Sequence, residues 1–330
     1  MKTAVVILNY NGEKMLREYL PTLLKHTPEA DIYVADNASS DGSIAMLREM
    51  FPQIHLIRLD KNYGFAGGYN QALLDLPYEY YMLLNSDVEV TAGWLATLED
   101  FMESHPDVAA CQPKLLSIHQ RDSFEYAGAS GGFLDKYGYP FCRGRIFSTV
   151  EKDRGQYDDS CEVMWATGAA LMVRTSDWQK AEGFDSMFFA HNEEIDLCWR
   201  LRRMGRKIYV VPESVVYHVG GGTLPQGNPR KTYLNFRNNL LMLYKNLPSK
   251  DLRRVMAVRY FLDRIAALQA LLVNRNLADF KAIFKARRDF QRMKYEIEDT
   301  KNENQEPLLW PSSILIQYYL KGHRCFSALS

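Results

Sequence analysis

A short polar tip, Asn85-Ser86-Asp87, follows the continuous apolar run Tyr80–Leu84. Such a run is typical of a parallel strand that is buried on both faces. Open α/β sheets bind their ligands at the carboxyl ends of these strands, where the carboxylate of Asp87 would emerge. A hard carboxylate there suits a divalent cation that also holds a substrate diphosphate. The tip therefore indicates an enzyme that uses a nucleotide-linked donor.

A second acidic group, Glu193, Glu194 and Asp196, stands beside aromatic residues at the start of a predicted helix. A carboxylate in a partly apolar pocket has the properties required of a general base. Asp196 and Arg200 are four residues apart and can pair along the helix, which leaves the two glutamates freer to act. The alternative is that these acids only interact favourably with the helix dipole, as acids in a first turn commonly do.

Turn-forming residues follow the first two predicted strands. Asn9 and Asn11 come after the first strand, and the segment 36–42, which begins with Asp36, follows the second. Adjacent strand ends form one edge of a cleft, where Asp36 could accept hydrogen bonds from a base or a ribose hydroxyl. The alternative is ordinary turn chemistry, because Asp, Asn, Ser and Gly are the residues that form turns.

A glycine-rich loop, Asp60–Asn70, follows the third predicted strand. Its small residues allow the backbone to approach a ligand, and the N-terminus of the next helix favours an anion. Gly64, Gly67 and Gly68 lack the spacing of the dinucleotide-binding fingerprint, which also follows the first strand rather than the third. The loop therefore counts against a nicotinamide-dependent enzyme.

The elements that must position these residues alternate between strand and helix over residues 4–110. This alternation predicts a mostly parallel sheet in a three-layer α/β fold with right-handed crossovers. Residues 112–165 are rich in Gly, Tyr and Phe without a helical period, so we predict hairpins and loops that form part of a substrate wall. The predicted strands are 4–8, 31–35, 54–59, 80–84, 108–110, 165–173, 208–211 and 215–218, and the predicted helices are 13–26, 44–51, 65–74, 92–104, 194–204 and 233–247.

The bulk composition limits the classes of function. The 330 residues include 40 Lys+Arg and 40 Asp+Glu, and a net charge of zero argues against a dedicated nucleic-acid binder. The five cysteines lack the spacing of a zinc or redox site, so we expect reduced thiols in a cytoplasmic protein. We expect no signal peptide and no spanning helix, because a strand follows Met1-Lys2-Thr3 at once and no apolar run reaches roughly 18 residues. A peripheral position at the inner face of the cell membrane is the alternative.

We expect residues 1–248 to form the α/β domain and residues 249–330 a separate helical region. From Leu240 onward the sequence has 16 Lys+Arg and 9 Asp+Glu, a balance of +7 against −7 for the rest. A basic tail on an acidic body suggests an anionic partner such as a membrane surface. Apolar residues at helical spacing, such as Ile265, Leu268 and Leu272, fit that role or packing against the catalytic body or a second copy of the chain.

Together, the order and spacing of these motifs resemble those of inverting GT-A glycosyltransferases of family 2, and most closely their rhamnosyltransferase-like branch. The resemblance covers residues 3–247 and implies a Rossmann-like α/β fold, a mostly parallel sheet with flanking helices, followed by the helical C-terminal region. The motifs are Asn9-Tyr10-Asn11, Asp36-Asn37-x-Ser39-x-Asp41-Gly42, Asn62-x-Gly64-Phe65-Ala66-x-Gly68-x-Asn70, Asn85-Ser86-Asp87, Glu193-Glu194-x-Asp196 and His218.

The resemblance implies a role for each motif. Asp87 and His218 would bind a divalent metal, Mg²⁺ or Mn²⁺, because Asn85 stands where many relatives have an Asp. The general base would come from the acidic motif, with Glu194 as the first candidate and Glu193 as the second. Asp36 would bind the nucleotide base, and the rest of the nucleotide–sugar pocket would be lined by Asn9, Asn11, Asn62, Gly64, Phe65, Asn70, Asn85 and Ser86.

The resemblance implies an enzyme of polysaccharide biosynthesis at the cell envelope. It would move a sugar, rhamnose from dTDP-rhamnose or the sugar of a UDP-sugar, to a saccharide or lipid-linked glycan by metal-assisted inverting displacement. A homodimer is one arrangement that the helical region could support. Two alternatives are a sugar nucleotidyltransferase, which would need a basic glycine-rich loop that residues 8–12 lack, and a non-catalytic sugar-binding module, which would not need acids at two separate places.

Overall fold

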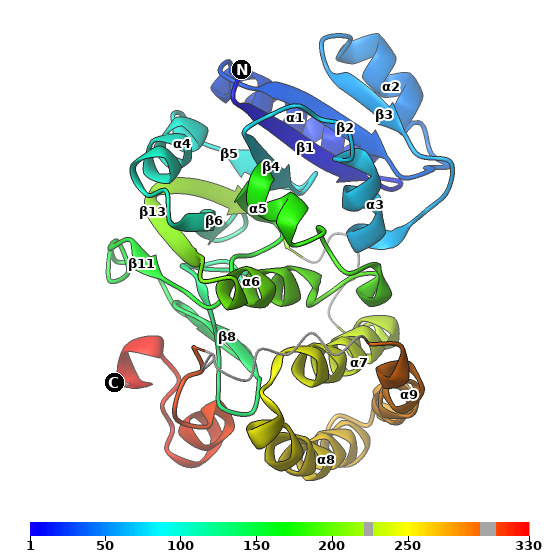
Figure 1. Cartoon of the computed structure of the whole chain (residues 1–330), viewed down its shortest axis with the longest axis vertical. Helices are drawn as coiled ribbons and strands as arrows, with labels where there is room; N and C mark the ends of the chain where they lie inside the picture. Colours follow the sequence, from blue (N-terminus) through cyan, green and yellow to red (C-terminus); the bar gives the residue numbers. More distant parts are fainter. Residues whose placement is uncertain (221–226, 298–307, 330) are drawn as a thin grey trace.

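The computed structural model describes residues 1–220, 227–297 and 308–329 of the chain (Figure 1). Nine strands of this part form the central sheet: β1 (Thr3–Asn9), β2 (Asp31–Asp36), β3 (His55–Arg58), β4 (Tyr80–Leu84), β5 (Val88–Val90), β6 (Val108–Ser117), β11 (Cys161–Glu162), β12 (Ala170–Arg174) and β13 (Lys207–His218). Their order is β11-β13-β6-β12-β4-β1-β2-β3, with β5 paired to β13. Strands β5, β11 and β12 run opposite to their neighbours and the others point the same way, so the sheet is mostly parallel.

Helices cover both faces of this sheet, as the alternating pattern predicts. They are α1 (Glu13–His26), α2 (Ser43–Met50) and α4 (Trp94–Ser104) on one face, and α3 (Gly64–Ala72), α5 (Thr175–Lys180) and α6 (Glu193–Arg203) on the other. Both faces need a cover of helices because the buried residues of each strand alternate between them, as strand β1 shows. Val5 and Ile7 lie in the core under α1, α2 and α4, whereas Val6 lies in the core under α3, α5 and α6.

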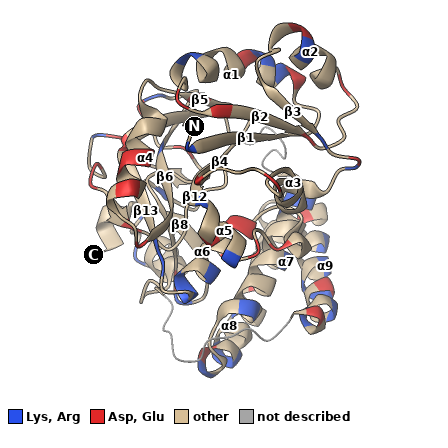
Figure 2. Cartoon of the chain, turned by 45° about the horizontal axis from the view of Figure 1, so that its top comes forward, with Lys and Arg blue, Asp and Glu red and all other residues tan. Residues whose placement is uncertain are grey.

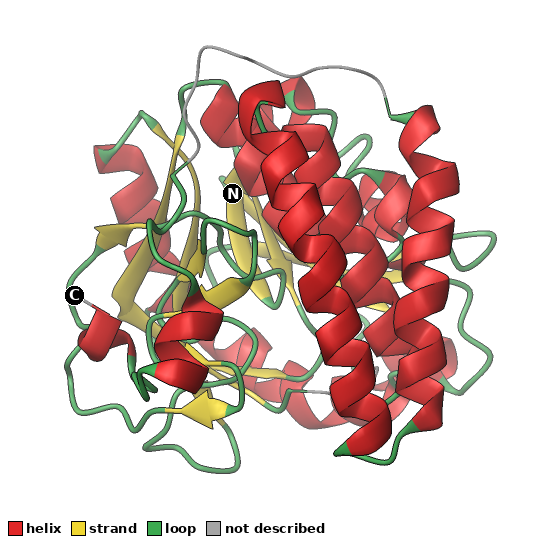
Figure 3. Ribbon diagram, turned by 90° about the horizontal axis from the view of Figure 1, so that it is seen from below, coloured by secondary structure: helices red, strands yellow, loops and turns green. Residues whose placement is uncertain are grey.

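The remaining helices lie at the other end of the molecule, the lower end in Figure 1. Helix α7 (Pro229–Asn246) contacts α6 and packs on α9 (Leu277–Met293), and α8 (Ser249–Leu272) packs on α9. From below, these long helices stand beside the smaller sheet and the C-terminal segment (Figure 3). That sheet is formed by β7 (Gly132–Leu134), β8 (Pro140–Cys142), β9 (Arg145–Ile146) and β10 (Thr149–Val150). The boundary at residue 248 stays a prediction.

The C-terminal segment packs on the smaller sheet. It includes the short helices η3 (Ile316–Leu320) and η4 (Phe326–Leu329). Ile314 and Leu329 share an apolar cluster with Phe141 and Ile146 of the smaller sheet. None of the helices in the described ranges combines the length and the apolar character needed to cross a membrane.

Two predicted strands are longer than expected. Strand β6 runs to Ser117 instead of ending at residue 110, because its polar residues are satisfied inside the protein. Gln112 accepts a hydrogen bond from the backbone of Thr167 at 2.9 Å, and the buried Lys114 ammonium lies 2.9 Å from Asp153. The two strands predicted at 208–211 and 215–218 are one strand, β13, with an irregularity between them.

Two elements also begin at residues that differ from the prediction, one later and one earlier. The strand predicted from residue 165 begins only at Ala170. Trp165 is not part of this strand, because it pairs with Gly132 in an isolated bridge. Helix α7 begins at Pro229 rather than at 233, because Asn228 caps it by accepting a 2.9 Å hydrogen bond from the Arg230 backbone. Pro at the first helical position is also favourable.

Candidate active site

The structure brings Asp87 and His218 together. Strand β5 pairs with the end of β13 so that Val88 stands opposite His218, which places Asp87 beside the imidazole ring. His218 Nε2 lies 3.1 Å from Asp87 Oδ1, and Asn85 Nδ2 lies 3.4 Å from the same nitrogen. Both Asp87 and His218 are buried. A strand tip and a strand end that are far apart in sequence therefore share one polar site.

Glu125 is a third residue of this site, and the sequence analysis did not identify it. Its Oε2 atom lies 3.4 Å from His218 Nδ1 and accepts a 2.6 Å hydrogen bond from the Ala127 backbone. Burial opposes a charged imidazole, but contacts with Asp87 and Glu125 raise the pKa of His218 to about 10. Glu125 stands in an irregular segment, where a single acid carries no sequence signal.

The donor atoms of this site fit a small divalent cation. Two ligands at adjacent corners of an octahedron with bonds of about 2.1 Å lie ~3 Å apart. Asp87 Oδ1 and His218 Nε2 have this separation, and carboxylate with imidazole is a ligand set that Mn²⁺ accepts once the cation has displaced the Nε2 proton. In the described part of the chain, no group of three His, Cys, Asp or Glu residues is arranged to hold a metal ion. A cation held by these two residues would therefore need further ligands from a substrate.

The ends of β1 and β2 form a second polar network, which contains three predicted site residues. Asn9 Nδ2 donates to Asp36 Oδ1 at 3.0 Å and to Ser39 Oγ at 3.1 Å. Asn11 Oδ1 accepts from the Ser40 backbone at 2.7 Å. Asn9 Oδ1 is buried and has no hydrogen-bond partner in the described ranges, so an acceptor is left over at this edge.

Ser86 lies at the same edge, beside Gly12. A Cβ atom added at Gly12 would lie 3.6 Å from Ser86 Oγ, an ordinary contact, but would collide with Asn9 Oδ1. The close approach of the backbone to Asn9 is therefore one that only glycine allows.

The glycine-rich loop is held by side-chain amides. Asn62 Oδ1 accepts from the Gly64 backbone at 2.8 Å, and Gly64 has a φ of +75°, where a Cβ would collide with Phe189. The Asn70 side chain donates a 2.7 Å hydrogen bond to the Phe184 carbonyl and accepts a 2.9 Å hydrogen bond from the Phe184 N–H. The Asn70 amide thus joins α3 to the segment that leads to α6.

Gly168 lies between Phe65 of α3 and Glu194 of α6. A Cβ atom at Gly168 would lie 3.4 Å from the Phe65 ring and 3.7 Å from Glu194 Cβ. The next residue, Ala169, accepts a 2.9 Å hydrogen bond from the Asn85 backbone. Three predicted site residues, Phe65, Asn85 and Glu194, are therefore arranged around one short backbone segment.

The segment that precedes α6 has an unusual backbone. Phe189, His191 and Asn192 all have positive φ values, between 65° and 71°. Non-glycine residues in this region are strained, and such strain often accompanies functional sites. Here it turns the chain so that the first turn of α6 carries Glu193 and Glu194 toward the interior of the protein.

The three acids of this turn have different surroundings. Asp196 is fully buried and accepts from Arg200 at 2.8 Å, Lys245 at 3.0 Å and Asn246 at 2.7 Å. Burial raises the pKa of Glu194 to about 7, and burial together with Glu194 raises the pKa of Glu193 well above its usual value. Each glutamate also has a buried Oε2 without a hydrogen-bond partner in the described ranges.

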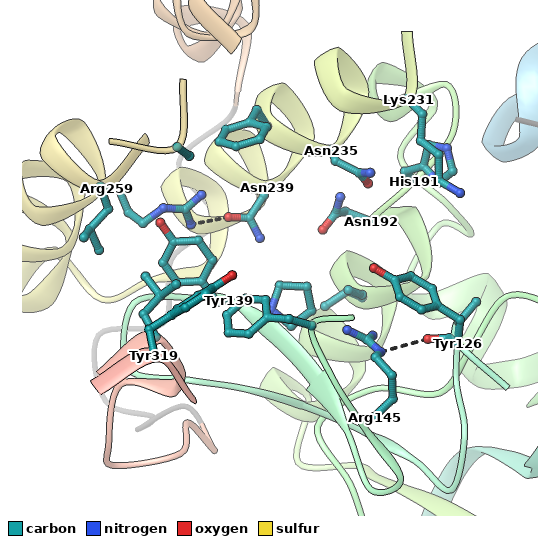
Figure 4. Close-up of a pocket in the computed structure, with 18 of the residues that line it drawn as sticks. Tyr126, Tyr139, Arg145, His191, Asn192, Lys231, Asn235, Asn239, Arg259 and Tyr319 are labelled. Carbon is teal, nitrogen blue, oxygen red and sulfur yellow. Dashed lines mark hydrogen bonds between the residues drawn. The ribbon is translucent and has the colours of Figure 1, made fainter. Parts of the chain in front are cut away.

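A cavity of about 790 Å³ begins at Glu194 and reaches α8 and the C-terminal segment. Lys231, His191 and Tyr126 lie toward one end of it, and Arg259 and Tyr319 toward the other (Figure 4). Neither Asp87 nor Glu193 lines this cavity. Of the two glutamates, only Glu194 can therefore meet a molecule bound there.

Arg145 is a buried cation in the wall of this cavity. Its guanidinium donates to the Tyr126 carbonyl at 2.9 Å and stacks on the Tyr126 ring, 4.7 Å from the ring centroid (Figure 4). Its hydrogen bonds go to neutral groups, the Tyr126 carbonyl and Cys142 Sγ, and the nearby Glu125 also stabilises its charge. A buried guanidinium with neutral hydrogen-bond partners is suited to an anion such as phosphate.

The chain is similar to known glycosyltransferases. A model of Glycosyl transferase family 2 matches residues 4–152. The N-acetylglucosaminyl-diphospho-decaprenol L-rhamnosyltransferase of Mycobacterium tuberculosis is 26% identical over 233 residues, which cover 65% of this chain and 75% of that protein. Rhamnosyltransferase WbbL of Escherichia coli is 25% identical over 281 residues, which cover 80% and 98%.

A solved structure supports the fold. The crystal structure of GalNAc-T7 with UDP, GalNAc and Mn²⁺ superposes with a TM-score of 0.61 at 15% identity. The alignment covers 90% of this chain and 56% of the other, so the chain spans just over half the length of that protein. The solved structure shows the fold, and the sequence matches show a glycosyltransferase whose residues 4–152 match family 2 and which is similar to bacterial rhamnosyltransferases.

Proposed function

We propose that this enzyme transfers a sugar from a nucleoside-diphosphate donor, dTDP-rhamnose or alternatively a UDP-sugar, to a lipid-linked glycan or other saccharide with inversion at the anomeric carbon. The observation that carries the proposal is the position of the segment Gly168–Ala169. Ala169 accepts a hydrogen bond from Asn85, near the proposed metal ligands, and Gly168 lies close to Glu194, which lines the cavity. The rhamnosyltransferase relatives support rhamnose as the sugar.

The donor would occupy the edge formed by the ends of β1, β2 and β4. Asp36 and Asn9 would contact the nucleoside, and the spare acceptor Asn9 Oδ1 suits a ligand N–H or O–H. Asp87 and His218 would hold the cation, and when bound it would supply a Lewis acid for the diphosphate leaving group. Asn62 and Asn70 would act by holding the loop that covers the donor.

Glu194 would act on the acceptor from the opposite side. Its carboxylate removes the proton of the acceptor hydroxyl while the acceptor oxygen forms a bond to the anomeric carbon. The bond from that carbon to the diphosphate breaks in the same step, and the diphosphate leaves with the electron pair. One attack opposite one departing group inverts the anomeric centre.

The cavity beyond Glu194 would hold the acceptor. Its wall combines Trp165, Tyr139 and Phe147 with the buried guanidinium of Arg145. Aromatic rings stack on sugars and Arg145 suits a phosphate, so this wall fits a glycan that is linked through phosphate to a lipid. The acceptor named for the Mycobacterium tuberculosis relative, a diphospho-decaprenol, has this chemistry.

The test of the proposal is the Asp87→Ala variant. We expect sugar transfer to fall about 100- to 1,000-fold, because charge on the leaving diphosphate loses its electrostatic partner. The Mn²⁺-dependent thermal shift produced by dTDP should also disappear, since the ligand would lose its metal link to the native state. Asp75→Ala, an exposed acid after α3, is the matched control. Full activity of Asp87→Ala with dTDP-rhamnose and with UDP-sugars would contradict the proposal.

Glu125 gives a second prediction, because a carboxylate behind a ligating histidine orients the ring. Glu125→Ala should weaken Mn²⁺ binding in the presence of dTDP about 10- to 100-fold. Glu125→Gln, whose amide oxygen can still accept from Nδ1, should retain most of the affinity. Titration of free Mn²⁺ by electron paramagnetic resonance measures this, with Asp122→Ala as a control on the same loop. Equal affinities for all three variants would show that Glu125 does not position His218.

A further inference from the structure

The second half of helix α8 exposes its large apolar residues, whereas Val255 in the first half is buried in the core. The buried residues of α8 also include the ion pair Arg259–Asp263, whose atoms lie 3.1 Å apart, and small alanines. Phe261, Ile265, Leu268 and Leu272 share one exposed face at helical spacing, and the least exposed of them, Leu268, is 49% exposed. A helix of a globular protein normally does the reverse. This face therefore indicates contact with an apolar phase outside the described chain.

The C-terminal segment adds a second strip to this face. Ile316, Tyr319 and Leu320 of η3 are exposed, and Leu320 is 80% exposed. Ile265 of α8 and these three residues also line the cavity that begins at Glu194. The two exposed apolar strips therefore meet at the outer end of the proposed acceptor cavity. Tyr at such a border suits a membrane interface, because its ring is apolar and its hydroxyl is polar.

The charges around these strips are basic. Residues 249–297 and 308–329 contain 14 Lys+Arg and 5 Asp+Glu. Arg253, Arg254 and Arg275 lie near the two ends of the apolar face of α8, and Lys321 and Arg324 follow η3. Figure 2 shows the same contrast, with Lys and Arg recurring along α8 and α9 and with Asp and Glu on α4. Apolar residues flanked by basic ones are typical of helices that lie on an anionic bilayer.

We propose that the face formed by Phe261, Ile265, Leu268, Leu272, Ile316, Tyr319 and Leu320, the apolar docking face, binds the surface of an anionic lipid bilayer. Helix α8 lies in the plane of the interface, and no part of it crosses the membrane. The outer end of the cavity then opens toward the acyl chains, so that a lipid-linked acceptor reaches Glu194 without passing through water. This last step rests on the proposed function, whereas binding to the bilayer does not.

Vesicle flotation of the full chain tests the proposal. Wild-type protein should float with vesicles of phosphatidylcholine that contain roughly one quarter phosphatidylglycerol, and added salt should weaken this binding. The triple variant Phe261→Ser, Leu268→Ser, Leu272→Ser should lower the partition coefficient by ~10-fold or more, because three apolar side chains no longer enter the interface. None of these three residues lines the cavity, so transfer to a water-soluble saccharide should be unchanged.

The matched control replaces three exposed apolar residues of the catalytic part, Met50→Ser, Leu74→Ser and Met204→Ser. It should float as wild type does. Equal flotation of both triple variants, or no flotation of the wild type, would overturn the docking proposal and leave the proposed function standing. A wild-type dimer that the Phe261 triple variant converts to monomers, without vesicle binding, would assign the face to a second copy of the chain. Vesicle binding without any sugar transfer would instead contradict the proposed function.

Discussion

Replacing Glu194 with glutamine should reduce the rate of sugar transfer by about 100- to 10,000-fold, the range expected for loss of a general base. Glutamine keeps the shape of the side chain but cannot accept the acceptor's proton. Binding of the donor nucleotide should not change, because Glu194 lies on the cavity side of Gly168, away from Asp87. Transfer of radiolabelled sugar measures the rate, and the thermal shift with dTDP and Mn²⁺ measures donor binding.

The pH dependence of the wild type gives a second readout of the same residue. Burial raises the pKa of Glu194 to about 7, and a base acts only when it is deprotonated. We therefore expect kcat/KM to rise as the pH rises and to level off above about pH 7. The raised pKa also means that folding favours the protonated acid, so its contribution to stability is present at low pH and is lost as the pH rises through about 7. Glu194→Gln should accordingly gain thermal stability over the wild type at high pH.

Glu193→Gln is the matched control, because it makes the same chemical change one residue away. Glu193 does not line the cavity, so its replacement should reduce transfer far less than that of Glu194. If Glu193→Gln abolished transfer while Glu194→Gln remained active with an unchanged pH profile, the base would be Glu193. The role that we assign to Glu194 would then be wrong.

The parts of this site that follow strands could be predicted from the sequence. Apolar runs that end in polar residues mark parallel strands, and the carboxyl ends of such strands meet at one edge. This pattern predicts Asn9, Asp36 and Asp87 on that edge, and the structure has Asn9 and Asp36 as the last residues of β1 and β2 and Asp87 just after β4. Helices α1 to α4 follow from the apolar period and from glycine or serine near their first residues.

Features that depend on tertiary contacts could not be predicted in the same way. Glu125 has no local pattern, and its role appears only when β13 brings His218 to it. The apolar stripe of α8 fits either packing or a membrane surface, since a sequence does not say which face of a helix is buried. The structure buries Arg259 and Asp263 and exposes Ile265, Leu268 and Leu272, so packing on the catalytic body is wrong for these three residues.

Replacing Asp196 with alanine should lower the free energy of unfolding by about 3–5 kcal/mol, the usual cost of removing one partner of a buried ion pair. The sequence indicated only the contact with Arg200, four residues along α6. In the structure, Lys245 and Asn246 of α7 bind the same carboxylate, so Asp196 joins α6 to α7. Its removal would leave the two cations in a protein interior without their common partner.

The direction in which stability changes with pH distinguishes Asp196 from Glu194. Burial opposes its charge, but Arg200 and Lys245 hold the pKa of Asp196 below its usual value. Its contribution to stability is therefore present above the unfolded-state pKa and is lost as the pH falls, the reverse of Glu194. Urea unfolding followed by circular dichroism should show the largest loss for Asp196→Ala near neutral pH and a smaller one in acid.

Asp107→Ala is the control for this measurement. Asp107 also pairs with a lysine, Lys207, at 2.8 Å, but both side chains are about half exposed, and such pairs contribute little. A loss in Asp196→Ala no larger than in this control would contradict the structural role. If the loss in Asp196→Ala is larger, as we expect, two acids of one helical turn differ in effect because of their surroundings. Glu194 has a buried Oε2 without a hydrogen-bond partner in the described ranges and can take a proton. Asp196 accepts hydrogen bonds from three side chains, which hold it in the fold.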